Sequence, residues 1–217
     1  MVLKLSGSES VFQNQPWATF GKKSNNCYDY AVGNYESYRP EKSSPGNRAD
    51  RPSGSVDCKQ LADRVLLDNP GHVYRVDPAT PCRKGYYKIM MVTTGPTVFN
   101  MYSDFHFYKQ HGKVQYRIKR GDTAQSIAKF FKVPTVSVGS VVPGKRIIIK
   151  KNLWSHKRGW GTGPLLTDAC GKIIIDPRKA CRNYDSLKYS KVCGSFCVKN
   201  SGVKTGKSKP KVPHKFF

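Results

Sequence analysis

The stretch SNNCYDYAVG, residues 24–33, places a cysteine where a helix is expected to begin. From Asn26 to Tyr35 the apolar residues recur at helical spacing, and Asn25 or Asn26 is a candidate N-cap. A helix N-terminus lowers the pKa of a thiol, which makes Cys27 a candidate nucleophile. The alternative is a buried structural thiol, because cysteine is one of the most frequently buried residue types. The local pattern leaves both interpretations open.

The elements that follow are of two types. A loop rich in Pro and Gly, residues 39–55, precedes VDCKQLADRVLLDNPG, residues 56–71, whose apolar residues fall on one helical face. The run YYKIMMVT, residues 86–93, is almost continuously apolar, which is typical of a buried strand. The sequence therefore predicts an α+β fold.

Two later segments alternate as strands do, and each carries a histidine. In FNMYSDFHFYKQ, residues 99–110, His106 faces the side opposite to its two phenylalanine neighbours, and NLWSHKRGW, residues 152–160, carries His156. A cysteine nucleophile needs an imidazole that takes its proton and a third polar group that fixes the tautomer of that imidazole. The order along the chain therefore predicts Cys27 as nucleophile, His106 as general base and His156 as the orienting residue. A purely structural role for each of them is the alternative.

The charge of the chain is unusual for its size. Its 217 residues include 38 Lys and Arg against 14 Asp and Glu, a formal net charge of +24, which indicates an anionic partner or a crowded assembly. The 38% of hydrophobic residues argues against a disordered chain. MVLKLSGSES at the N-terminus has no apolar run, and no stretch approaches the roughly 18 apolar residues of a membrane span. We expect a protein made in the cytoplasm, with no signal peptide and no membrane span.

The cysteine count of seven is odd. If Cys27 is free, the other six can form three disulfides in any of about 15 connectivities, or stay reduced as structural thiols. Their spacing is too loose for a zinc site, since the chain contains no CxxC pair. We expect structural thiols or disulfides, and neither a metal nor a cofactor.

Residues 112–151 have the pattern of a small unit, in the order strand, turn, helix, loop and strand. The pieces YRIKRGDT, SIAKFFKV and VPGKRIIIK resemble a LysM module, in the order typical of that family. LysM modules bind the N-acetylglucosamine of peptidoglycan or chitin beside their helix, which implies a glycan site at Gly121, Asp122 and Thr123. The second helix of the family is replaced here by the short PTVSVGS. A working sugar site and a docking block without sugar binding are both compatible with this pattern.

The remaining motifs resemble a second family. NNCYDYA, DFHFYK, WSHK, IIDPRKACRNY and CGSF occur in the order seen in papain-fold proteins related to the NlpC-type peptidases, which are found in phages, bacteria and large DNA viruses. The resemblance covers most of residues 25–110 and 152–197. It implies a papain-like helix on an antiparallel sheet, and the same roles for Cys27, His106 and His156 that their order predicts.

These patterns together predict the organisation of the chain. We expect an extended N-terminal arm over residues 1–24 and a papain-like domain made of residues 25–111 and 152–198. Residues 112–151 would then be a LysM-like lobe inserted in a hairpin, with a sheet of its own. The segment 199–217 has six Lys and no acid, and we expect a basic tail that adheres to an acidic neighbour and contributes nothing to the fold.

Two functions of different class fit these expectations. The first is a structural, minor capsid-type component of a large DNA virus particle, with other virion proteins as partners and a residual Cys-His hydrolase site. The missing secretion signal and the shortened LysM-like unit favour it. The alternative is an active cell-wall amidase or peptidase that holds glycan through its LysM-like unit. Nucleic-acid binding by the 11 basic residues between Lys109 and Lys151 is a third, less favoured option.

Overall fold

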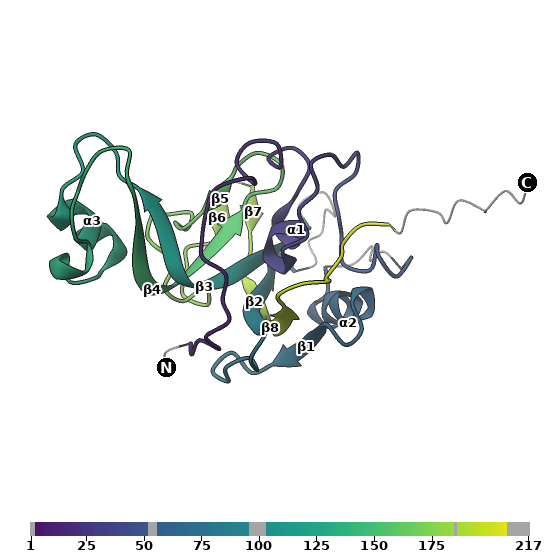
Figure 1. The fold of residues 1–217 in the computed structure, drawn as a ribbon. Helices are drawn as coiled ribbons and strands as arrows, with labels where there is room; N and C mark the ends of the chain where they lie inside the picture. The colour runs from purple at the N-terminus through teal and green to yellow at the C-terminus, as the bar shows by residue number, and fades with distance from the viewer. Residues whose placement is uncertain (1–2, 52–55, 96–102, 185, 208–217) are drawn as a thin grey trace, which may run out of the picture.

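A computed structural model describes residues 3–51, 56–95, 103–184 and 186–207. Within these residues the chain forms three α-helices, a six-stranded antiparallel sheet and a two-stranded hairpin (Figure 1). The fold is therefore α+β. The sheet has the order β1–β8–β2–β3–β4–β5, with β1 (Val73–Val76), β2 (Tyr86–Thr93), β3 (Phe105–Arg117), β4 (Arg146–Lys157), β5 (Pro164–Leu165) and β8 (Lys191–Lys199). The separate hairpin pairs β6 (Asn183–Tyr184) with β7 (Leu187–Lys188).

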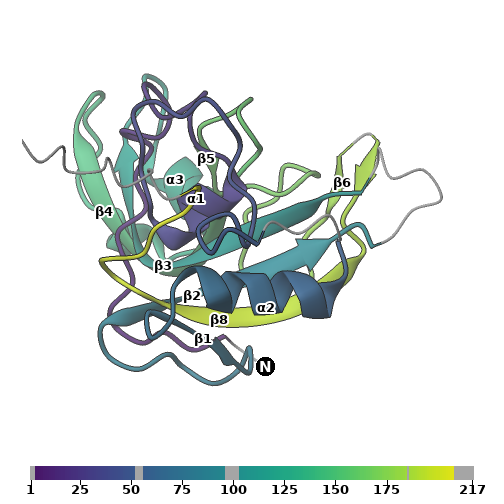
Figure 2. The ribbon, with the colours of Figure 1, turned by 90° about the vertical axis from the view of Figure 1, so that its right-hand side faces the viewer.

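Strand β2 lies in the middle of the sheet, and all eight of its residues are buried. One face of the sheet packs against α1 (Cys27–Val32) and α2 (Cys58–Asp68), and Figure 2 shows α2 running along β8 and β2. The other face carries a second apolar cluster, in which sheet residues such as Trp154 of β4 pack against Ile174 and Tyr189. Because both faces are covered, the strand is apolar except at the buried Lys88 and Thr93, and its predicted bounds are confirmed.

Helix α1 begins where the sequence predicts. The side chain of Asn26 accepts hydrogen bonds from the backbone N–H groups of Tyr28 and Asp29, so Asn26 is the N-cap. The helix ends at Gly33, which has a φ of 76° and closes it in the left-handed conformation that glycine adopts without steric cost. The helix is therefore only six residues long and stops short of the expected end at Tyr35.

Six of the seven cysteines form three disulfides, and Cys27 is the free one. The bridges are Cys58–Cys193, which ties α2 to β8, Cys82–Cys197 and Cys170–Cys181. The disulfide alternative is therefore confirmed. In the described part of the chain, no three His, Cys, Asp or Glu side chains gather as a metal site. None of the helices described has the length and apolar character needed to cross a bilayer.

The expectation of a separate sheet in residues 112–151 is wrong. Strands β3 and β4 run through both expected boundaries and stay paired out to Arg117 and Arg146, so the segment extends the main sheet. A register shift between His111 and Lys113 marks the near boundary. Beyond it, α3 (Ala124–Phe131) and a 3₁₀ turn pack on an apolar cluster of their own, at the far end of the hairpin (Figure 1).

The N-terminal arm lies along the sheet rather than away from it. Leu3 is buried in the cluster of Trp154, and Phe12 forms a parallel bridge with Val114. The backbone N–H of Phe12 donates to the carbonyl of Lys113 at 2.8 Å. The arm therefore covers apolar surface at the junction between the sheet and the α3 end of the hairpin.

The C-terminal segment is part of the fold up to residue 207, which corrects the expectation that it contributes nothing. Val203 is buried in the main core with the residues of α1 and α2. The hydroxyl of Thr205 donates to the carboxylate of Asp29 and accepts a hydrogen bond from the Asn34 amide at 2.9 Å. The remaining tail, residues 208–217, lies outside the described residues.

Candidate active site

Cys27, His106 and His156 gather at the end of the sheet where α1 begins. Cys27 is the first residue of α1, His106 lies at the start of β3 and His156 lies near the end of β4. In the antiparallel β3–β4 pair, Tyr108 lies opposite His156, which brings the two histidines to diagonal positions on one face. Cys27 and His106 both line a cavity of about 420 Å³.

The two histidines are in direct contact, and their partners fix the tautomers. The distance from His106 Nε2 to His156 Nδ1 is 2.7 Å, and His156 Nε2 lies 2.9 Å from the carbonyl oxygen of Thr167. A carbonyl only accepts, so His156 carries its proton on Nε2 and its Nδ1 accepts from the Nε2–H of His106. In neutral His106 the lone pair is therefore on Nδ1, which has no hydrogen-bond partner among the described residues.

Both histidines are held neutral. Burial lowers the pKa of His156 to about 4. Burial, together with the repulsion that a second proton on the pair would meet at His156, holds the pKa of His106 well below its usual range. A neutral His106 with a free nitrogen is in the protonation state that a general base requires.

Cys27 lies on the other face of the sheet from the two histidines, near an edge of β3 that β4 does not cover. Its side chain belongs to the core cluster on the face that α1 covers, with Phe105 and Phe107, whereas His106 faces the opposite side. The pairing of β3 with β4 starts only at Tyr108, so the preceding residues have β2 on one side and no β4 partner on the other. The Cys27 Sγ lies at this edge, 3.8 Å from the carbonyl oxygen of Phe105.

The predicted contact between the Cys27 sulfur and a His106 nitrogen is not among the described hydrogen bonds. The thiol instead donates weakly to the Phe105 carbonyl, while the cavity joins the two side chains. Catalytic hydrogen bonds in substrate-free enzymes are often long and tighten only when substrate is bound. The structure therefore brings the histidines together and leaves Cys27 as a neighbour of the pair across the cavity.

The expected depression of the Cys27 pKa is wrong. Burial raises the pKa of the thiol, the charge of Asp104 raises it further, and the backbone N–H of Phe107 lowers it by a smaller amount. Cys27 is only 5% exposed, and α1 has too few residues to oppose this burial with a strong dipole. The resting pair is therefore a neutral thiol and a neutral imidazole.

The rim of the cavity combines cations with aromatic rings. Lys42 Nζ lies 5.6 Å from the ring centre of Trp160, and the Arg158 guanidinium lies 4.6 Å from that of Tyr184. The carboxylate that lines the cavity, Asp104, accepts a hydrogen bond of 2.6 Å from the Tyr189 hydroxyl. The field at the entrance is therefore positive and suits a substrate with an anionic group.

Reasoning from the sequence did not identify these rim residues. Arg158 and Trp160 stand two and four residues after His156, and Asp104 stands two residues before His106, so proximity to a candidate residue was a usable signal for these three. Tyr184 and Tyr189 come from a later, irregular segment and have no such signal.

The three residues expected to hold glycan have local structural roles. Asp122 accepts hydrogen bonds from the Lys119 backbone and the Tyr116 hydroxyl, Gly121 occupies a turn with a φ of 88°, and Thr123 caps α3. Glycan binding at this turn stays a prediction.

No protein-family model, no curated protein and no solved structure matches this chain. The function therefore has to be argued from the geometry of the site.

Proposed function

We propose that this protein is a papain-like cysteine hydrolase of the NlpC type, which cleaves an amide or ester bond through a covalent thioester on Cys27. The contact between His106 and His156 carries the proposal. It leaves His106 Nδ1 without a hydrogen-bond partner among the described residues, and His106 lines the same cavity as Cys27. If the two histidines had only a structural role, the fold would not require His106 Nδ1 to lack a partner among the described residues. It would also not require this nitrogen to belong to the residue that shares a cavity with Cys27, the free cysteine.

The residues have distinct roles in the proposed reaction. The Cys27 sulfur attacks the carbonyl carbon of the substrate while its proton passes to His106 Nδ1. The backbone N–H of Cys27, which has no partner among the described residues, donates to the oxygen that becomes negative. The intermediate collapses as His106 returns its proton to the leaving nitrogen or oxygen. Water then attacks the thioester with His106 as base, which releases the acid and restores the thiol.

The neutral resting state decides when the thiol becomes reactive. Because burial raises the pKa of Cys27 and lowers that of His106, proton transfer between them is unfavourable in the empty site. Attack and proton transfer then occur together once a substrate fills the cavity. Lys42 and Arg158 favour acyl substrates that carry a carboxylate or another anion, as peptides of an anionic wall polymer do.

Acylation of Cys27 tests the proposal without knowledge of the natural substrate. We expect a burst of p-nitrophenol from p-nitrophenyl acetate, together with one acetyl group on the peptide that contains Cys27, found by mass spectrometry. Cys27→Ala should remove both signals, and His106→Ala should abolish the burst while the circular dichroism spectrum stays unchanged. Hydrolysis by Cys27→Ala at the wild-type rate would overturn the proposal.

A structural role in a virus particle is the second candidate. The three disulfides favour an oxidising setting such as a virion or cell surface, and the charge of +24 favours acidic neighbours. A structural component should be retained at constant stoichiometry when purified particles are washed in high salt, and Cys27→Ala should be incorporated equally well. Loss of the protein in the wash would argue against this role.

A further inference from the structure

Lys109 is buried in β3 without a partner for its charge. The residue is 7% exposed, and within the described structure its amine has no hydrogen bond and no ion pair. Its nearest partners are two ring faces, with centres 4.4 Å away at Tyr87 and 5.7 Å away at Tyr30. An ammonium group has three N–H donors, and burying one without acceptors is costly. The described chain supplies no acceptor for this amine, so its acceptors have to come from water or a ligand in the space beside it.

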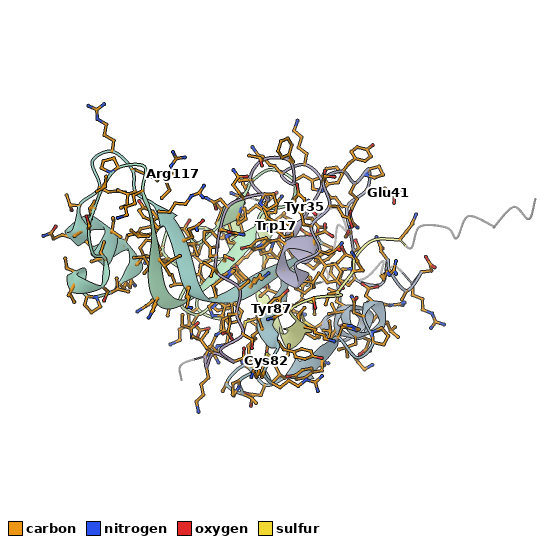
Figure 3. All side chains as sticks on the ribbon, viewed as in Figure 1. Trp17, Tyr35, Glu41, Cys82, Tyr87 and Arg117 are labelled. Carbon is orange, nitrogen blue, oxygen red and sulfur yellow. A yellow bond between two sulfur atoms is a disulfide. The ribbon has the colours of Figure 1, made fainter. Side chains whose placement is uncertain are left out.

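The amine lies on the wall of a second cavity, of about 230 Å³. This cavity is at the C-terminal end of α1 and shares no lining residue with the cavity at Cys27. Gly33 lies directly against the amine: a Cβ built on it would be 3.6 Å from Lys109 Nζ and 3.2 Å from the Tyr87 hydroxyl oxygen. The walls include Trp17, Tyr30, Tyr87 and His111, and Figure 3 labels the first and third of these.

The tyrosine hydroxyls and His111 of this cavity are satisfied by the protein. The Tyr87 hydroxyl donates to the carbonyl of Ala31 at 2.9 Å, and the Tyr30 hydroxyl lies 2.6 Å from Ser155 Oγ. His111 Nδ1 lies 2.9 Å from the carbonyl of Ser10 and therefore carries a proton. No carboxylate lines the cavity, and burial alone lowers the pKa of Lys109 to about 8.

We propose that this cavity binds a carboxylate ligand with an aromatic body, in which the Lys109 ammonium pairs with the carboxylate and the surrounding rings contact the body. Trp17 and Tyr30 meet edge to face, with ring centres 5.1 Å apart, and provide an apolar wall beside the amine. A carboxylate supplies the acceptors that the ammonium lacks, in a charge-assisted hydrogen bond.

Benzoate is the probe for this site. Titration calorimetry of the full chain at pH 7 and constant ionic strength should show saturable binding of benzoate at one site, and at least tenfold weaker binding of the neutral benzamide. Lys109→Met should abolish the heat of benzoate binding. The control is Lys113→Met, which removes an exposed lysine of the same strand and should leave the heat of benzoate binding unchanged. Replacing a buried charge with an apolar side chain of similar size is tolerated, so the variant should fold.

The pH dependence gives a test on the wild-type chain. Burial keeps the pKa values of Tyr30 and Tyr87 above this range and lowers that of His111 to about 3, so Lys109 is the lining group that titrates between pH 7 and pH 9. The protonated fraction of an amine with a pKa near 8 falls about tenfold between these pH values, and the affinity for benzoate should fall by about the same factor. Equal binding of benzoate by Lys109→Met, equal affinity for benzamide, or no saturable binding would each overturn the proposal.

Discussion

Two of the disulfides, Cys58–Cys193 and Cys82–Cys197, close overlapping loops of the chain. Taken alone, the loops are long, with sequence separations of 135 and 115 residues. When one bridge is intact, the unfolded chain already holds the other two cysteines near each other. The path from Cys58 through Cys82 and Cys197 to Cys193 is only about 28 residues long. The stabilisation by each bridge therefore depends on the presence of the other.

Loop-closure entropy gives the size of this dependence. Removing either bridge while the other remains frees a loop of about 28 residues, which costs about 3.6 kcal/mol of stability. Removing the second bridge then frees the full loop, which costs about 5 kcal/mol. Removing both bridges therefore costs about 1.4 kcal/mol more than the sum of the losses from removing each bridge alone. Such a coupling is well above the usual error of about 0.5 kcal/mol in additivity tests.

Urea denaturation of alanine variants measures this coupling. The variants are Cys58→Ala with Cys193→Ala, Cys82→Ala with Cys197→Ala, and all four changes together. If the fourfold variant is too unstable to measure, the single-bridge variants still distinguish a loss of about 3.6 from one of about 5 kcal/mol.

The third bridge is the internal control. Cys170–Cys181 spans only 11 residues, so its removal should cost about 2.8 kcal/mol and add to the loss of either long bridge. Strictly additive losses for the two long bridges, or a loss near 5 kcal/mol from each single removal, would refute the reasoning from overlapping loops.

Three further outcomes follow from burial. Iodoacetamide should label native Cys27 much more slowly at pH 7 than the urea-unfolded chain, because burial raises the pKa of the thiol; equal rates would contradict this. The free energy of unfolding should fall as the pH drops from about 6.5 towards 4, since an unfolded histidine binds its proton near 6.5 and folded His156 only near 4. His156→Gln should reduce this slope in urea titrations, while the buried His106 and His111 maintain the rest of it; an unchanged slope would exclude His156 as a source. Val203→Ala should cost about 2 kcal/mol, against less than about 0.5 kcal/mol for the exposed Val136→Ala control; similar losses in thermal melts would show that residue 203 is not core.

Features that depend on local pattern were predictable from the sequence. The apolar run of β2 requires two covered faces wherever it lies, and Asn26 caps a helix through atoms only two and three residues away. The alternation around His106 likewise separates it from Phe105 and Phe107 in any strand.

Features that depend on distant atoms were not predictable. The tautomers of the histidine pair are fixed by the carbonyl of Thr167, a backbone group that any residue type supplies. The pKa of Cys27 follows from burial by the whole fold, which outweighs the local effect of a short helix. Val203 lies in a segment with the composition of a tail, and only its place against α1 and α2 makes it core.

The β3–β4 hairpin divides the chain into a part that tolerates changes in length and a part that does not. Inserting or deleting one residue between His106 and Tyr108 would turn His106 to the other face relative to Tyr108 and its partner His156, and so separate the two histidines. Beyond Arg117 and Arg146, the α3 end packs on an apolar cluster that it shares with Phe12 of the arm and Leu153 of β4, and this cluster includes neither histidine. Evolution can therefore lengthen, shorten or exchange the tip of this hairpin while the histidine pair keeps its register.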